Sequence, residues 1–114
     1  MVKYIPHERD IVYIDLSPIK GHEQKGKRPA LVISSKLFNQ FTNMALLCPI
    51  SNNNKSFPTH YELERTKKVK GSVLCEHLRS IDYNERNIEF IERCSQEEYE
   101  NVTDLIKSFF DNEE

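Results

Sequence analysis

The segment 20–29 carries the strongest chemical signal in this sequence. It reads KGHEQKGKRP and holds four cationic side chains against one carboxylate, together with His22 and two of the chain's three glycines. Glycine permits unusual backbone turns, so a cationic loop of this kind can close around a phosphate group. The same composition also suits a solvated loop whose charges only keep the protein soluble. The residues alone leave both interpretations open.

Arg28 differs from the lysines in this segment, because Pro29 restricts the backbone directly after it. A guanidinium group presents a planar fork of donors that matches the oxygens of a phosphate. The alternative is a structural ion pair with Glu23, Asp15 or Glu76.

The segment 48–55 predicts a second group of polar contacts at the end of an apolar run. Its residues from Ser51 onward supply a hydroxyl and three amides, which can donate and accept hydrogen bonds but add little charge. A lone serine here is also typical of a turn. The sequence contains neither a GxSxG motif nor a Ser-His-Asp pattern that would make it a nucleophile.

The segment 76–82 contains His77, whose side chain is the kind best suited to move protons near neutral pH. A lone histidine is more often structural, so this role stays open. Arg79 and Asp82 in the same segment are predicted to form a local ion pair at a turn.

The three cysteines, Cys48, Cys75 and Cys94, are odd in number and form no CxxC pair. This pattern argues against a disulfide framework or a zinc site, so we expect buried, reduced thiols. We also find no Asp/Glu cluster suited to Mg²⁺. The sequence therefore predicts no metal and no cofactor.

Composition places the chain among small globular domains. It has 114 residues, of which 38% are hydrophobic and 30% charged, which predicts one domain over residues 1–114. No apolar run approaches a membrane span or a signal peptide, so we expect a cytoplasmic protein. Residues 1–83 contain 13 Lys/Arg against 8 Asp/Glu, whereas residues 84–114 contain 3 against 10. This asymmetry suits a polyanion-binding side, or simply an acidic terminal helix.

The elements that must position these side chains are short strands and two helices. Strands are expected at 11–16, 30–34, 44–50, 61–64, 72–75 and 88–91. A short helix is expected at 36–41. A capping box at Ser95 and Glu98 and an apolar stripe from Tyr99 to Phe110 predict a C-terminal amphipathic helix. The expected fold is mainly β, a small bent antiparallel barrel with a terminal helix.

The sequence resembles the MazF/PemK/Kid toxins of bacterial type II toxin–antitoxin systems. The resemblance covers about residues 4–83 and lies in the blocks 9–12, 15–24, 26–34, 48–51 and 71–82, with a G-x-E-Q…G…R-P pattern across 21–29. It implies an SH3-like, CcdB/PemK-like β-barrel that forms a homodimer. It also implies metal-independent, sequence-specific cleavage of single-stranded RNA, which inhibits translation. The implied partner is a MazE/PemI-like antitoxin with an acidic C-terminal tail.

The resemblance implies Arg28 and Ser51 as the catalytic residues. In the Kid branch the functional set is a His in the first loop with an Arg and an Asp in the third block. Here His22 matches the His and Glu76 replaces the Asp, but Leu74 stands where the Arg is expected. Residues expected to assist or to contact RNA are His22, Glu23, Gln24, Lys27, Asn52, Asn53, Lys55, Phe57, Glu76, His77 and Arg79.

His77 stands where the family commonly has Gln, so it either adds a proton-transfer group or changes a contact. The alternative to a nuclease is a non-catalytic, CcdB-like module that poisons a protein such as DNA gyrase. A third hypothesis is a degenerate family member that only binds RNA or an antitoxin.

Overall fold

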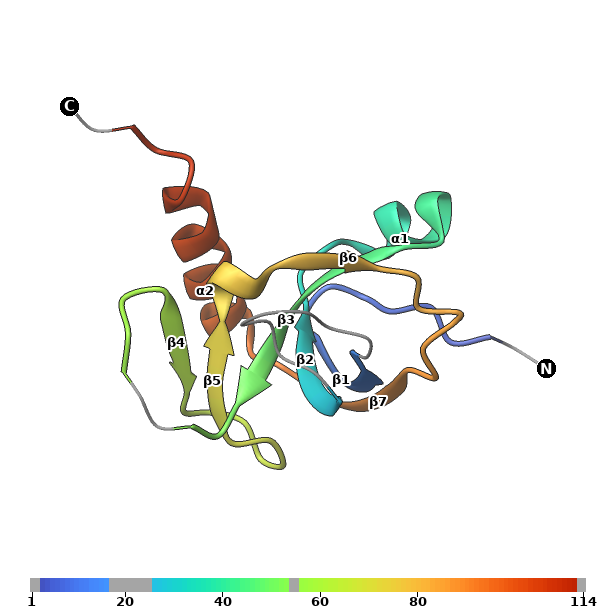
Figure 1. Cartoon of the computed structure of the whole chain (residues 1–114), viewed down its shortest axis with the longest axis horizontal. Coiled ribbons are helices and arrows are strands. Elements are labelled where there is room, and N and C mark those ends of the chain that lie inside the picture. Colours follow the sequence, from blue (N-terminus) through green and yellow to red (C-terminus); the bar gives the residue numbers. More distant parts are fainter. Residues whose placement is uncertain (1–2, 17–25, 54–55, 113–114) are drawn as a thin grey trace.

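The computed structural model describes residues 3–16, 26–53 and 56–112. These residues form a mainly β fold with two helices, as the sequence predicts (Figure 1). The elements in chain order are β1 Asp10–Asp15, β2 Lys27–Val32, α1 Lys36–Thr42, β3 Ala45–Ser51, β4 His60–Leu63, β5 Gly71–Leu74, a 3₁₀ turn at Cys75–His77, β6 Arg79–Ile81, β7 Glu89–Arg93 and α2 Gln96–Ser108.

Strand β3 is the centre of the sheet. The strands follow the order β4-β5-β3-β2-β1-β7, and β6 also pairs with β3; every pairing is antiparallel. The first residues of β3 pair with β6 and its last residues pair with β5, so one edge of β3 serves two partners. This division bends the sheet and sets the β4–β5 hairpin at an angle to the rest (Figure 1).

The bent sheet does not close into the expected complete barrel, because the end strands β4 and β7 are not paired with each other. A side chain joins them instead. The Glu92 carboxylate on β7 accepts hydrogen bonds from the backbone N–H groups of Lys67, Lys68 and Val69, at 3.0, 2.9 and 2.8 Å. These three residues follow β4, so one carboxylate satisfies the backbone at the open seam of the sheet.

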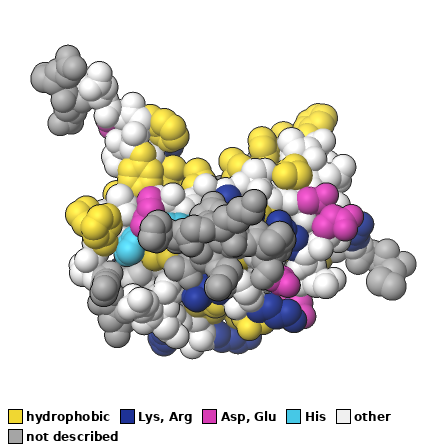
Figure 2. Space-filling view, viewed as in Figure 1, with side chains coloured by type: hydrophobic (Ala, Val, Ile, Leu, Met, Phe, Trp, Pro, Cys, Tyr) yellow, Lys and Arg dark blue, Asp and Glu magenta, His cyan; other side chains and the backbone are white. Residues whose placement is uncertain are grey.

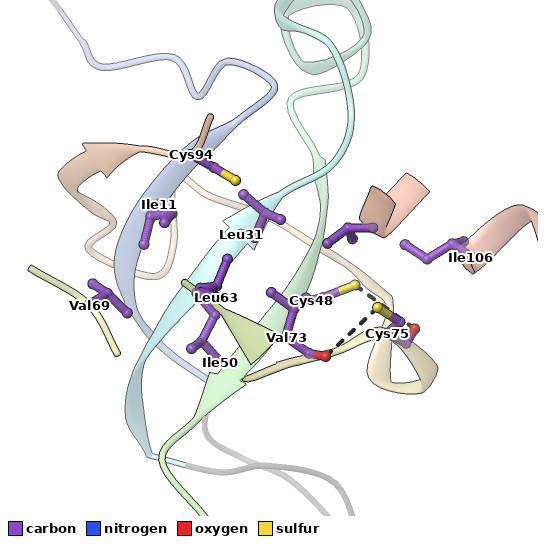
Figure 3. Close-up of a cluster of buried hydrophobic side chains, with 11 residues drawn as sticks. Ile11, Leu31, Cys48, Ile50, Leu63, Val69, Val73, Cys75, Cys94 and Ile106 are labelled. Carbon is purple, nitrogen blue, oxygen red and sulfur yellow. Dashed lines mark hydrogen bonds between the residues drawn. The ribbon is translucent and has the colours of Figure 1, made fainter. Parts of the chain in front are cut away.

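Two apolar clusters lie on opposite faces of the sheet, because side chains alternate along each strand. One, drawn in Figure 3, is built around Ile11, Leu31, Cys48 and Val73 and is covered by α2 through Val102 and Ile106. The other is built around Val12, Ile14, Ala30 and Leu47.

All three cysteines are fully buried and free, which confirms the expected reduced thiols. Burial raises their pKa values, that of Cys75 to about 12 and that of Cys94 to about 11.

Each helix begins at a serine cap. The Ser35 hydroxyl accepts from Phe38 N–H in α1, and the Ser95 hydroxyl accepts from Glu98 N–H at 3.1 Å in α2. In the expected capping box the Glu98 side chain would bond back to the start of α2, but here it makes tertiary contacts. The buried Glu98 carboxylate accepts from the N–H groups of Glu64 and Arg65 after β4.

The apolar stripe on α2 is shorter than predicted. Val102 and Ile106 are buried, but Phe109 and Phe110 follow the last helical turn and are 39% and 80% exposed. No helix among the described residues is long and apolar enough to cross a membrane.

The sequence prediction missed β6. Residues 79–81 pair with Ala45–Leu47 of β3, so Arg79 belongs to a strand and not to a turn. The predicted Arg79–Asp82 ion pair is wrong: the Asp82 carboxylate accepts from Asn84 N–H, and Arg79 Nη1 is buried without a hydrogen-bond partner among the described residues. A three-residue strand whose pairing residues lie more than 30 positions earlier leaves little periodic signal.

Candidate nucleic-acid cleavage site

A line of polar residues crosses the sheet on the face opposite α2. The β2–β3 pairing ends at Ala30 and Pro49, so Arg28 and Ser51 each lie two residues beyond this last pair, on the same face of their strands. Ser51 pairs with Ser72 of β5, and Ser72 pairs with Glu62 of β4. Directly paired residues point to the same face of a sheet. The four side chains therefore share one face and span four neighbouring strands.

Ser51 is held firmly at the end of β3. It is 6% exposed, and its hydroxyl oxygen accepts a hydrogen bond from Asn53 N–H at 3.1 Å. The neighbouring strand begins at Gly71 with a φ of +131°, where an added Cβ would lie 2.4 Å from the Ser51 carbonyl oxygen. Only glycine allows the two backbones to approach so closely. The hydroxyl hydrogen of Ser51 can then donate to a bound oxyanion.

His60 lies on the same face of β4, two residues before Glu62. His60 pairs with Leu74, and its Nε2 lies 2.8 Å from the Glu76 carboxylate in the 3₁₀ turn. His77 Nε2 lies 3.8 Å from the same carboxylate. Figure 2 shows His and Asp/Glu side chains adjacent to one another over the β4–β5 side of this face.

The surroundings of Glu76 favour its ionised form. Burial by itself raises the pKa of this carboxyl, but hydrogen bonds from its own backbone N–H and from His60 outweigh burial and lower the pKa below its ordinary value. Glu76 is therefore a carboxylate at neutral pH. It can orient an imidazole or accept a hydrogen bond.

A cavity of about 370 Å³ opens beside these residues. Phe57, which is 57% exposed, stands at its wall with its ring centroid 5.5 Å from that of His60. The volume lies in the range of small-ligand pockets. The lining residues are Asn52, Ser56, Phe57, His60, Glu62, Leu63, Lys70, Gly71 and Ser72.

The structure thus gathers most of the predicted site residues that it describes. Asn52 and Phe57 line the cavity, while Asn53 bonds to Ser51. Glu76 and His77 lie together at the next turn of the chain. Lys27 is exposed at the start of β2, opposite Asp15.

Other predictions fall elsewhere or cannot be followed. Arg79 pairs with Leu47 on β6, outside the line of polar residues. His22, Glu23, Gln24 and Lys55 lie outside the described residues. Among the described residues, no group of three or more His, Cys, Asp or Glu side chains could hold a metal ion.

Sequence reasoning missed His60 and Ser72. The available signal for His60 was the alternating pattern from 60 to 63, which puts His60 and Glu62 on one face and Tyr61 and Leu63 on the other. Its partner Glu76 lies 16 residues away, and no local pattern predicts their contact.

Comparison with known proteins identifies the family. Residues 7–110 match the family described as "PemK-like, MazF-like toxin of type II toxin-antitoxin system". The chain belongs to this family. It is 33% identical to the endoribonuclease toxin MazF of Escherichia coli K12 over 84 residues, which cover 74% of this chain and 75% of that protein.

Solved structures of the family agree with the fold. A crystal structure of MazF from Deinococcus radiodurans superposes with a TM-score of 0.89 and 32% identity, covering 94% of this chain and 97% of that one. A MazE-MazF structure from the same organism gives a TM-score of 0.81 and 27% identity, covering 94% and 96%. These relatives favour an endoribonuclease over the CcdB-like alternative.

Proposed function

We propose that this chain is the toxin of a type II toxin–antitoxin system and that it cleaves single-stranded RNA without a metal ion, inhibiting translation and growth. Membership of the MazF/PemK family and its endoribonuclease relatives support the activity. The observation that supports the assignment of the site is that Arg28 and Ser51 lie on one face of the sheet, each two residues beyond the last β2–β3 pair.

The reaction uses a nucleophile that the substrate already contains. The ribose 2′-hydroxyl attacks the adjacent phosphorus, the bond to the 5′-oxygen of the next nucleotide breaks, and the 2′-proton passes to a base while the leaving oxygen gains one. The products are a 2′,3′-cyclic phosphate and a 5′-hydroxyl. This step consumes no water and needs neither a metal ion nor a nucleophile from the protein.

Arg28 and Ser51 supply the electrostatic part of this reaction. Negative charge accumulates on the phosphate oxygens in the transition state, and preorganised donors there stabilise it most. The Arg28 guanidinium offers a fork of N–H donors, and the nearly buried Ser51 hydroxyl offers one more from a fixed position. Arg28 also serves as the candidate proton donor to the leaving oxygen. Glu76, His77 and His22 are the candidate auxiliary groups.

The RNA strand is proposed to run along the line of polar residues, from β2 toward the β4–β5 hairpin. Figure 2 shows Lys and Arg side chains along the lower part of this face, where they can contact phosphates. Asn53 bonds to Ser51, and Asn52 and Phe57 line the cavity on the same side of the sheet, where all three can contact bases. The acidic α2 lies on the opposite face of the sheet.

We further propose that residues 1–114 act as one toxin domain in the cytoplasm, as a homodimer. The solved MazE-MazF complexes support an antitoxin of the MazE/PemI type as the partner. An acidic tail of that antitoxin would fold over the same cationic surface and exclude RNA from it.

The test is cleavage of a labelled single-stranded RNA by the purified chain in EDTA. We expect discrete cuts that leave 2′,3′-cyclic phosphate ends. Arg28→Lys keeps the charge but loses the fork, and we expect its rate to fall roughly 10²–10³-fold. Lys107→Gln, an exposed change on α2, is the control and should cut like the original chain.

Uncut RNA, cuts that require a divalent metal, or an Arg28→Lys variant that cuts at the original rate would each contradict the proposal. A DNA break that appears only with gyrase would instead support the CcdB-like alternative.

A further inference from the structure

The cavity beside Ser51 contains groups that the cleavage reaction does not use. His60, Ser72 and Lys70 line it, and none of them is needed to stabilise the phosphate held by Arg28 and Ser51. His60 is the most constrained of the three. Glu76 holds its Nε2 at 2.8 Å, its backbone N–H donates to the Phe57 carbonyl, and its ring contacts the Phe57 ring.

We propose that this cavity is a nucleobase pocket that determines cleavage specificity, in which Phe57 stacks on one base of the RNA and His60, fixed by Glu76, hydrogen-bonds to the edge of that base. The proposal rests on the proposed function and adds to it the residue that reads sequence. His60 is thus a specificity-determining residue and takes no part in bond cleavage.

Distance separates this role from the chemical step. His60 lies two strands away from Ser51 across the sheet and two residues further along the strand direction. With strands about 4.8 Å apart and about 6.8 Å between every second residue, their Cα atoms are about 12 Å apart. An imidazole at that distance does not share a phosphate with the Ser51 hydroxyl. A base attached to the same or the next nucleotide reaches it.

The charges around the cavity favour a base over a second phosphate. Glu62 lines the cavity, and the ionised Glu76 lies directly behind His60. The lysine of the lining, Lys70, donates one of its three ammonium N–H groups to the Thr66 carbonyl, at 3.0 Å. Two carboxylates against one ammonium group disfavour a second anion, whereas a neutral ring with donors and acceptors on its edge is accommodated.

Phe57 supplies the stacking surface that recognition of single strands requires. Its ring is 57% exposed although it belongs to the cavity wall and contacts a constrained imidazole. Unstacked bases bind to such exposed aromatic faces, and hydrogen bonds to the base edge then distinguish one base from another. The Asn52 amide and the Ser72 hydroxyl are further hydrogen-bonding groups in the same wall.

The first experiment measures specificity. The chain and its variants cleave a random-sequence RNA pool in EDTA, and sequencing of the products gives the base preference at each position around the cut. We expect His60→Ala to reduce the preference at one position by about tenfold or more and to leave the other positions unchanged. His60→Gln, which can still hydrogen-bond, should alter the preferred base at that same position.

The controls separate this effect from misfolding and from loss of catalysis. His7→Ala is the matched truncation, because His7 lies before β1, far from the β4–β5 hairpin, and its backbone bond to Asp10 is retained. It should leave the preference profile unchanged. Arg28→Lys should reduce cleavage at all sequences alike. An unchanged His60→Ala profile, with rates either equal or uniformly lower, would overturn the proposal.

A second experiment detects the pocket without cleavage. Arg28→Lys protein is titrated into short single-stranded RNAs that carry one 2-aminopurine at successive positions. Stacking on Phe57 should quench the fluorescence at one position, and Phe57→Leu should remove the quenching. Phe90→Leu, an exposed aromatic of β7, is the control. If no position is quenched, or if Phe57→Leu does not change the quenching, the pocket does not bind a base, whether or not the original chain cleaves RNA.

Discussion

Replacing Glu92 by glutamine would measure how much one carboxylate contributes to the free energy of unfolding by joining β7 to the segment after β4. Glu92 on β7 accepts three backbone N–H groups from residues 67–69, at 2.8–3.0 Å. Glutamine has nearly the same shape but one acceptor oxygen and no charge. At least one of the three N–H groups therefore loses its partner, and the others lose the strengthening that an ionised acceptor gives.

The magnitude follows from the number and kind of these bonds. A hydrogen bond to a charged group contributes roughly 1.5–3 kcal/mol, against about 0.5–1.5 kcal/mol for a neutral one. Glu92 is only partly buried, so water replaces some of what is lost. We expect Glu92→Gln to reduce the free energy of unfolding by about 2 kcal/mol, which lowers the Tm of a domain of this size by roughly 8 °C.

The effect should also depend on pH with a defined sign. Burial by itself raises the pKa of Glu92, but the hydrogen bonds from Lys67, Val69 and Lys68 outweigh burial and lower the pKa below its ordinary value of 4.5. A carboxyl with a lowered pKa stabilises the fold fully above its ordinary pKa. That stabilisation disappears as the pH falls through the lower, folded value. The difference in free energy of unfolding between the original chain and Glu92→Gln should be constant from pH 7 to about 5 and should become smaller below pH 5.

The assay is thermal unfolding followed by circular dichroism, at intervals between pH 7 and pH 3. Glu89→Gln is the control, because Glu89 lies exposed on the same strand. A Tm of Glu92→Gln within about 1 °C of the original chain at pH 7 would refute the reasoning. A difference in Tm between Glu92→Gln and the original chain that grows as the pH falls would also refute it.

Two further predictions concern the backbone near Ser51 and the buried thiols. Gly71→Ala should destabilise the protein by more than about 2 kcal/mol and slow RNA cleavage, because its Cβ would lie 2.4 Å from the Ser51 carbonyl; Gly26→Ala, at φ +80° with no atom within 4 Å, should cost only about 1–2 kcal/mol. Chemical denaturation and cleavage rates of the two variants measure the difference, and equal effects would contradict it. The three thiols should react with a disulfide reagent at pH 8 only after unfolding, because burial raises their pKa values. Labelling of the folded protein within minutes would disprove this.

Much of the fold could be predicted from local sequence. The alternation and apolar runs located six of the seven strands, the capping box at Ser95 located α2, and the short helix expected at 36–41 corresponds to α1. The candidate pair Arg28 and Ser51 also came from sequence, because the resemblance of the blocks 26–34 and 48–51 to the MazF/PemK/Kid toxins implies it. Local patterns carry this information because strand and helix periodicities lie within a few consecutive residues.

What the sequence by itself determined is therefore the kinds of element, the family, and two of the residues proposed to act on phosphate. Only the tertiary structure decided that the sheet remains open, that Glu92 joins its ends, and that His60 meets Glu76 beside an exposed Phe57. These contacts join elements that the sheet order brings together across many intervening residues. Local propensity does not encode such pairings, because the free energy that selects them arises only when the whole sheet is assembled.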